Sequence, residues 1–107
     1  MGVVFCMGMA MSKTIHFVYI LKCSDGTYYY GYTSNLDIRL KQHKAAKSQY
    51  TKGRLPVKLV YFEEYKTEEE ALKREKQLKG GRTRRKTIMG LIAAFPYEKL
   101  YVYEQNL

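Results

Sequence analysis

Two stretches rich in β-branched and aromatic residues, 15–22 and 27–33, flank the turn sequence Ser-Asp-Gly at 24–26. This pattern predicts a β-hairpin, because such side chains favour strands while aspartate and glycine favour tight turns. The segment therefore predicts that the domain is built on a small antiparallel sheet.

The length of the hairpin loop decides which side chains share a face of the sheet. A two-residue turn would place Tyr19 and Tyr29 on opposite faces. A three-residue loop, with Gly26 in the left-handed conformation, pairs Tyr19 with Gly31 and places both tyrosines on one face. We predict the three-residue loop, which gives Gly31 a structural role opposite the Tyr19 ring.

The remainder of the chain predicts three helices and one more strand. The first helix is expected to start at Ser34 or Asn35, both good N-caps, and to run to about Ala46; the others are expected at 68–79 and about 84–94, and the strand at 57–65. Thr67 and Glu70 form a capping box at the start of the middle helix, and Pro96 ends the last one. The tail 99–104 (KLYVYE) is interpreted as a short strand. The predicted fold class is α+β, a small, mainly antiparallel three-stranded sheet flanked by helices, in the order β-β-α-β-α-α.

Composition excludes several classes of protein. The 107 residues have room for one domain with a modest core and carry a net charge of +9. Cys6 and Cys23 are too few for a disulfide framework and lack zinc-site spacing; they are compatible with a reducing cytoplasm, where we expect the protein. The longest apolar run, Val3 to Met11, is too short to span a bilayer, and no membrane partner is expected. The basic excess favours a polyanion such as nucleic acid, although basic surfaces also serve solubility.

The opening of the chain differs from the rest, since four of the five methionines lie in its first eleven residues, which carry no charge. We interpret 1–12 as a leader. It is either a disordered segment or a segment translated from a start codon upstream of a natural start near Met11. An additional edge strand at 3–7 is a third interpretation. Residues 13–95 form the predicted domain, and 96–107 form a C-terminal tail.

Two helices each place polar side chains on an apolar face. Glu75 lies on the apolar face of the helix 68–79, where a carboxylate is costly to desolvate unless it is paired or binds a metal. An ion pair with Lys79, four residues further on, is the structural alternative. Arg39 and His43 share one side of the preceding helix, where an arginine more often supports a structural carboxylate and a histidine is more often a buried ring.

Taken together, the spacing of these residues resembles the GIY-YIG endonuclease family. The matching positions are Phe-Val-Tyr at 17–19, Tyr-Tyr-Gly at 29–31, and then Arg39, His43 and Glu75. The resemblance covers about residues 15 to 92. It is strongest to the stand-alone, single-domain branch, which is similar to the nuclease half of the bacterial excision-repair subunit. Several positions in register over this length are more specific than a short motif.

The resemblance implies a metal-dependent endonuclease that hydrolyses DNA phosphodiester bonds in repair or recombination, with little sequence specificity. It implies that Glu75 binds one Mg²⁺ or Mn²⁺ and that Arg39 stabilises charge on the phosphoryl oxygens. It also implies that Tyr19 and Tyr29 line the water site, one of them as general base, while His43 polarises the water or a tyrosine. The residue types suit these roles, since arginine binds phosphate and Mg²⁺ keeps several waters beside one carboxylate.

A basic segment, 79–86, contains five cations and no acid. The residues expected to follow a phosphate backbone are Lys79, Arg82, Arg84, Arg85 and Lys86. A solvated basic face is the alternative. Two functions stay open: a DNA endonuclease, with or without a protein partner that targets it, and a nucleic-acid-binding module that keeps the fold without cleaving. An RNA-binding accessory is a third interpretation.

Overall fold

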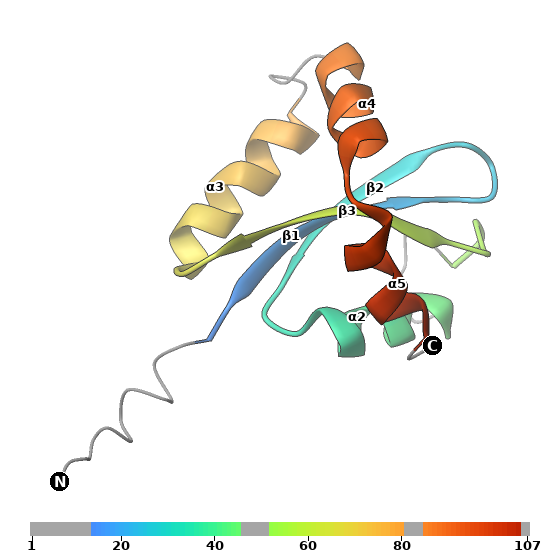
Figure 1. The fold of residues 1–107 in the computed structure, drawn as a ribbon, viewed down its shortest axis with the longest axis horizontal. Helices are drawn as coiled ribbons and strands as arrows, with labels where there is room; N and C mark the ends of the chain where they lie inside the picture. The colour runs from blue at the N-terminus through green and yellow to red at the C-terminus, as the bar shows by residue number, and fades with distance from the viewer. Residues whose placement is uncertain (1–13, 46–51, 81–84, 106–107) are drawn as a thin grey trace, which may run out of the picture.

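The computed structural model describes residues 14–45, 52–80 and 85–105, so the predicted leader 1–12 lies outside the described residues. Its three strands are β1 (His16–Lys22), β2 (Tyr28–Thr33) and β3 (Lys58–Tyr65). They form one antiparallel sheet in the order β2-β1-β3, with β1 at the centre (Figure 1). The α+β class and the three-stranded antiparallel sheet are therefore confirmed.

The hairpin has the predicted three-residue loop. Tyr19 lies opposite Gly31, and Leu21 lies opposite Tyr29. Gly26 has φ of +87°, a conformation that an L side chain rarely adopts. This register places the two predicted tyrosines on the same face of the sheet.

Within the described ranges four helices surround the sheet, and their bounds are α2 (Leu36–Lys44), α3 (Glu68–Lys79), α4 (Arg85–Ala94) and α5 (Tyr97–Gln105). The N-cap of α2 is Asn35, whose side chain accepts a hydrogen bond from the Ile38 amide at 3.1 Å. Thr67 caps α3 in the same way, as the capping box predicts. The observed order is β-β-α-β-α-α-α, one helix more than the sequence predicts.

The extra helix corrects the interpretation of the tail as a short strand. Residues 99–104 belong to α5, where Leu100 is buried in the core and Tyr103 packs beside it. The Tyr103 ring lies edge-on to Phe62 of β3, with centroids 5.4 Å apart. Packing of these two side chains onto the sheet outweighs the strand preference of the sequence Leu-Tyr-Val-Tyr.

Alternating residues of β1 build two separate cores, one on each face of the sheet. Tyr19 and Leu21 pack with α2 and α5 on one face. Val18 and Ile20 pack with α3 and α4 on the other. In Figure 1, α3 and α4 lie above the strands and α2 lies below them. We call these the α2 face and the α3 face.

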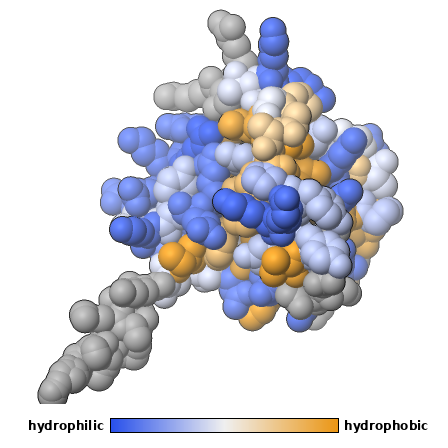
Figure 2. Space-filling model, viewed as in Figure 1, coloured by the Kyte–Doolittle hydropathy of each residue, from blue (hydrophilic) through white to orange (hydrophobic). Residues whose placement is uncertain are grey.

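The surface follows this layered arrangement. In the view of Figure 2, hydrophilic residues cover the side formed by α3, and hydrophobic residues gather toward α4. Among the described residues, no helix has both the length and the apolar character needed to cross a membrane.

Candidate active site

Tyr19 and His43 form a buried pair on the α2 face. Neither residue is exposed to solvent, and the Tyr19 Oη lies 2.9 Å from His43 Nε2. Burial, together with the charge of Arg39, lowers the pKa of His43 to about 4. Its ring is therefore neutral at pH 7 and can accept the Tyr19 proton in a hydrogen bond. Burial in turn raises the pKa of Tyr19 well above its ordinary value, so this residue remains a phenol.

Tyr29 and Arg39 complete the cluster on its more open side. The Tyr29 ring centroid lies 4.9 Å from that of His43 and 6.1 Å from that of Tyr19. Burial alone would lower the pKa of Arg39, but hydrogen bonds with both tyrosines reverse the effect and raise it. Arg39 Nη1 also donates to Gln42 Oε1 at 2.9 Å. We call Tyr19, Tyr29, Arg39 and His43 the tyrosine cluster.

Because Gly31 has no side chain, the rings of Tyr19 and Tyr29 can occupy the space beside its Cα. A Cβ at this position would lie 2.5 Å from Tyr19 Cζ and Oη and 2.8 Å from Tyr29 Cε2. Such distances are far below normal contact, so a side chain here would displace both rings. Glycine is therefore required at position 31 by the close approach of the tyrosines.

Glu75 belongs to α3, whose buried residues pack on the other face of the sheet. Its side chain is 16% exposed, and Oε2 lies 3.3 Å from Lys79 Nζ. The helix ion pair that the sequence offers as the structural alternative is thus present. The structure gathers four of the five predicted catalytic residues in the tyrosine cluster. The fifth, Glu75, lies on the helix that covers the opposite face.

The predicted nucleic-acid-binding residues are only partly described. Arg82 and Arg84 lie outside the described residues. Arg85 and Lys86, in the first turn of α4, are exposed. The Arg85 guanidinium carbon lies 5.8 Å from the centroid of the Tyr28 ring.

A second polar network, which the sequence analysis does not identify, joins β3 to α3. Arg74 Nε and Nη2 donate to the two carboxylate oxygens of Glu63 at 3.0 and 3.1 Å, and the hydroxyls of Tyr61 and Tyr65 donate to the same carboxylate. Burial opposes ionisation of Glu63, but these hydrogen bonds outweigh it and lower its pKa. The signal available in the sequence was weak, since Glu63 is one of two adjacent acids on a strand.

We expect Glu63→Gln to lower the free energy of unfolding by about 1–3 kcal/mol, because the partly buried Arg74 loses its charged partner. The depressed pKa makes this contribution complete above the ordinary carboxyl value of about 4.3, and acid removes it as the pH falls through the folded value. Urea unfolding at pH 7 and at pH 3 measures both effects. The exposed neighbour Glu64 provides the matched control, and an equal loss in Glu64→Gln would contradict the assignment.

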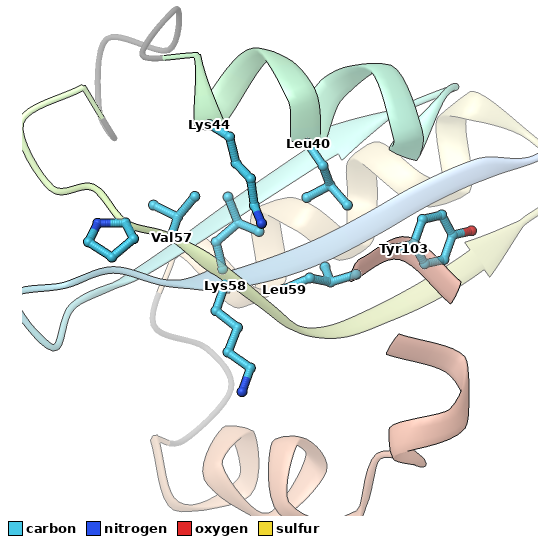
Figure 3. A pocket seen from close by; sticks show the side chains of 8 residues that line it. Leu40, Lys44, Val57, Lys58, Leu59 and Tyr103 are labelled. Carbon is cyan, nitrogen blue, oxygen red and sulfur yellow. The ribbon is translucent and has the colours of Figure 1, made fainter. Parts of the chain in front are cut away.

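A pocket of about 440 Å³ opens on the α2 face between α2, β3 and α5 (Figure 3). Its walls are mainly apolar, and the residues that line it are Leu21, Leu40, Lys44, Pro56, Val57, Lys58, Leu59 and Tyr103. None of the five predicted catalytic residues lines it. The Lys58 side chain points away from Leu40 and from the space between α2 and the sheet.

Comparisons with known proteins agree with this fold. A family model described as the GIY-YIG catalytic domain matches residues 15–88. Two UPF0213 proteins of Staphylococcus aureus, from strains Mu3 and MW2, are each 52% identical over 65 residues, which cover 60% of this chain and 79% of theirs. A solution NMR structure of a UPF0213 protein of Bacillus halodurans is 39% identical, has a TM-score of 0.50, and covers 78% of this chain and 90% of its own.

Proposed function

Because the chain belongs to the GIY-YIG catalytic domain family, we propose that it is an endonuclease that hydrolyses DNA phosphodiester bonds with Mg²⁺ or Mn²⁺. We propose a role in DNA repair or recombination, in the cytoplasm, with little sequence specificity. The observation that carries this proposal is the tyrosine cluster, in which a guanidinium and two phenols meet around a neutral imidazole. Phosphoryl transfer depends on positioning and charge stabilisation, which such a cluster can supply.

Burial separates the roles of the two tyrosines. Tyr19 is fully buried and hydrogen-bonded to His43, so we assign it the positioning of the imidazole. Tyr29 is partly exposed and in reach of Arg39, so we assign it the deprotonation of the attacking water. The guanidinium of Arg39 is suited to stabilise a phosphoryl oxygen beside it.

Glu75 is the residue that would hold the divalent cation. Carboxylate oxygens suit Mg²⁺ and Mn²⁺, and Mg²⁺ keeps several waters, so one partly exposed carboxylate fits such an ion. No group of three or more His, Cys, Asp or Glu in the described ranges could hold a metal ion, so the other ligands would be waters and substrate oxygens. Because α3 covers the face opposite the tyrosine cluster and also contacts the edge strand β2, the phosphate that meets both would lie at that edge of the sheet. A cation bound there would neutralise charge on the scissile phosphate and acidify a coordinated water.

One observation favours a second candidate, a nucleic-acid-binding module without cleavage activity. The Glu75 carboxylate already has a cationic partner in Lys79, and that pairing explains its position on α3 without a metal. The two candidates differ in whether any phosphodiester bond is broken. A protein partner that targets the chain to its DNA is compatible with both.

Nicking of supercoiled plasmid DNA tests the proposal. We expect nicking with Mg²⁺ or Mn²⁺, none with a chelator, and a rate that rises between pH 7 and 9, because a phenol that acts as the base must first lose its proton. His43, with its pKa lowered to about 4, contributes no inflection between pH 5 and 8. Tyr29→Phe removes the alkaline rise along with most of the activity.

The controls separate the candidates. Tyr28 precedes Tyr29 in β2, but its ring packs on the α3 face. Tyr28→Phe removes its hydroxyl and should leave the pH profile unchanged. DNA binding without nicking in any metal would favour the non-catalytic module. A rate that is flat between pH 7 and 9 would contradict a tyrosine base.

A further inference from the structure

Two lysines lie directly opposite each other at one end of the sheet. Lys22 ends β1, Lys58 begins β3, and the strand register pairs them. Both are exposed, and none of the ion pairs found between described residues includes either one. Like charges in directly opposed positions repel each other. This pair therefore costs folding free energy rather than adding to it.

Both lysines point to the α3 face. Leu21 and Leu59, their neighbours along the strands, pack into the core on the α2 face, and successive strand residues point in opposite directions. Figure 3 agrees, since the Lys58 side chain extends away from Leu40 and from α2.

A third cation and an aromatic ring adjoin the pair. Tyr28 of β2 lies opposite Lys22, so a row of three residues, Tyr28, Lys22 and Lys58, crosses the sheet. Arg85, at the start of α4, lies over the Tyr28 ring. The acid in the adjoining hairpin turn, Asp25, is already paired with Arg54 at 3.2 Å. We call Lys22, Lys58 and Arg85 the end-of-sheet patch.

The patch adjoins the tyrosine cluster through the edge strand β2. Tyr28 and Tyr29 are consecutive residues of this strand, so their rings point to opposite faces of the same sheet edge. A polymer that crosses the edge at this point would contact Arg85 and Tyr28 on one side and Tyr29 on the other. A phosphate backbone has the charge and the repeat needed to engage both sets of residues.

We propose that the end-of-sheet patch binds the phosphates of duplex DNA next to the cleaved bond, a contact that rests on the proposed function for its substrate. The patch adds two lysines of the sheet to the basic segment 79–86. Contacts of this kind fix the position of the duplex and carry no base specificity. This role explains why two lysines lie opposite each other, because a phosphate bound between them relieves the repulsion between their ammonium groups.

Fluorescence anisotropy of a labelled 20-base-pair duplex, measured as a function of salt, tests the proposal. For Lys22→Gln/Lys58→Gln we expect about ten-fold weaker binding at 100 mM salt. The slope of log affinity against log salt should fall by about two, because two phosphate contacts are lost. The melting temperature of the free double variant should rise by about 1–5 °C as the repulsion is removed. Single substitution of either lysine should give half of the change in slope.

A matched control carries the same loss of charge at the other end of β3. Lys66 follows the last residue of β3, and Lys73 lies on α3 beside Tyr65; both are exposed, and Lys66→Gln/Lys73→Gln should leave the salt slope unchanged. An equal loss of slope in this control, or an unchanged slope in the patch variant, would overturn the proposal. A lower melting temperature of the patch variant would identify the lysines as structural and overturn it as well. Because binding is measured without cleavage, absence of nicking would reject the endonuclease and leave the patch intact.

Discussion

Glu75→Gln is expected to abolish metal-dependent nicking, with a loss of at least about 10³-fold, or about 4 kcal/mol of transition-state stabilisation. The substitution keeps the size of the side chain and removes the charge that would hold the cation. Titration with Mn²⁺ adds a second measurement, because a weakened metal site requires a higher Mn²⁺ concentration for half-maximal activity. Quantified conversion of supercoiled to open-circular plasmid gives the rates.

Two controls keep this result specific. Glu69→Gln makes the same change in the exposed first turn of α3 and should leave the rate within about two-fold of the unmodified chain. Lys79→Gln removes the partner of Glu75, frees its carboxylate for the cation, and should lower the Mn²⁺ requirement. Nicking that persists in Glu75→Gln would contradict the role of Glu75 and indicate either another metal ligand or a contaminating nuclease.

Local rules were sufficient to predict the hairpin and α3. Only a three-residue loop with Gly26 in the left-handed conformation could bring Tyr19 opposite Gly31 and both tyrosines to one face, and the observed register agrees. The bounds of α3 match the prediction because Thr67 caps one end and Gly80 follows the other. In such segments the sequence itself contains the interactions that decide the structure.

Features that depend on packing between distant segments were not predictable in the same way. The pattern of 99–104 suits a strand, and its helical state depends on Leu100 and Tyr103 finding the apolar surface of β3. The sequence places Glu75 toward the sheet but does not specify which face α3 covers. The bidentate contact between Glu63 and Arg74 likewise joins residues of two elements whose relative position no local rule sets.

Gly31→Ala is expected to destabilise the fold and to remove activity together, although the change adds one methyl group. The new Cβ would meet the Tyr19 ring, which is fully buried and cannot swing into solvent. Relief requires a shift of the Tyr19 ring, which breaks its hydrogen bond with His43, or a shift of β2, which displaces Tyr29 from the tyrosine cluster. We expect a loss of about 2–3 kcal/mol in the free energy of unfolding and at least about 100-fold in nicking rate.

Gly90→Ala provides the opposite case within the same chain. Apart from its neighbours and the backbone of its own helix, no atom of the described residues lies within 4 Å of a Cβ built at Gly90, which is exposed in the interior of α4. Alanine is a better helix former than glycine, so this variant should gain about 0.5–1 kcal/mol and keep its activity. Urea unfolding of the two variants should thus give changes of opposite sign. Normal stability of Gly31→Ala would show that β2 can move away from the Tyr19 ring without loss of folding free energy. Normal nicking by the same variant would show that cleavage does not require Tyr19 and Tyr29 in their present positions.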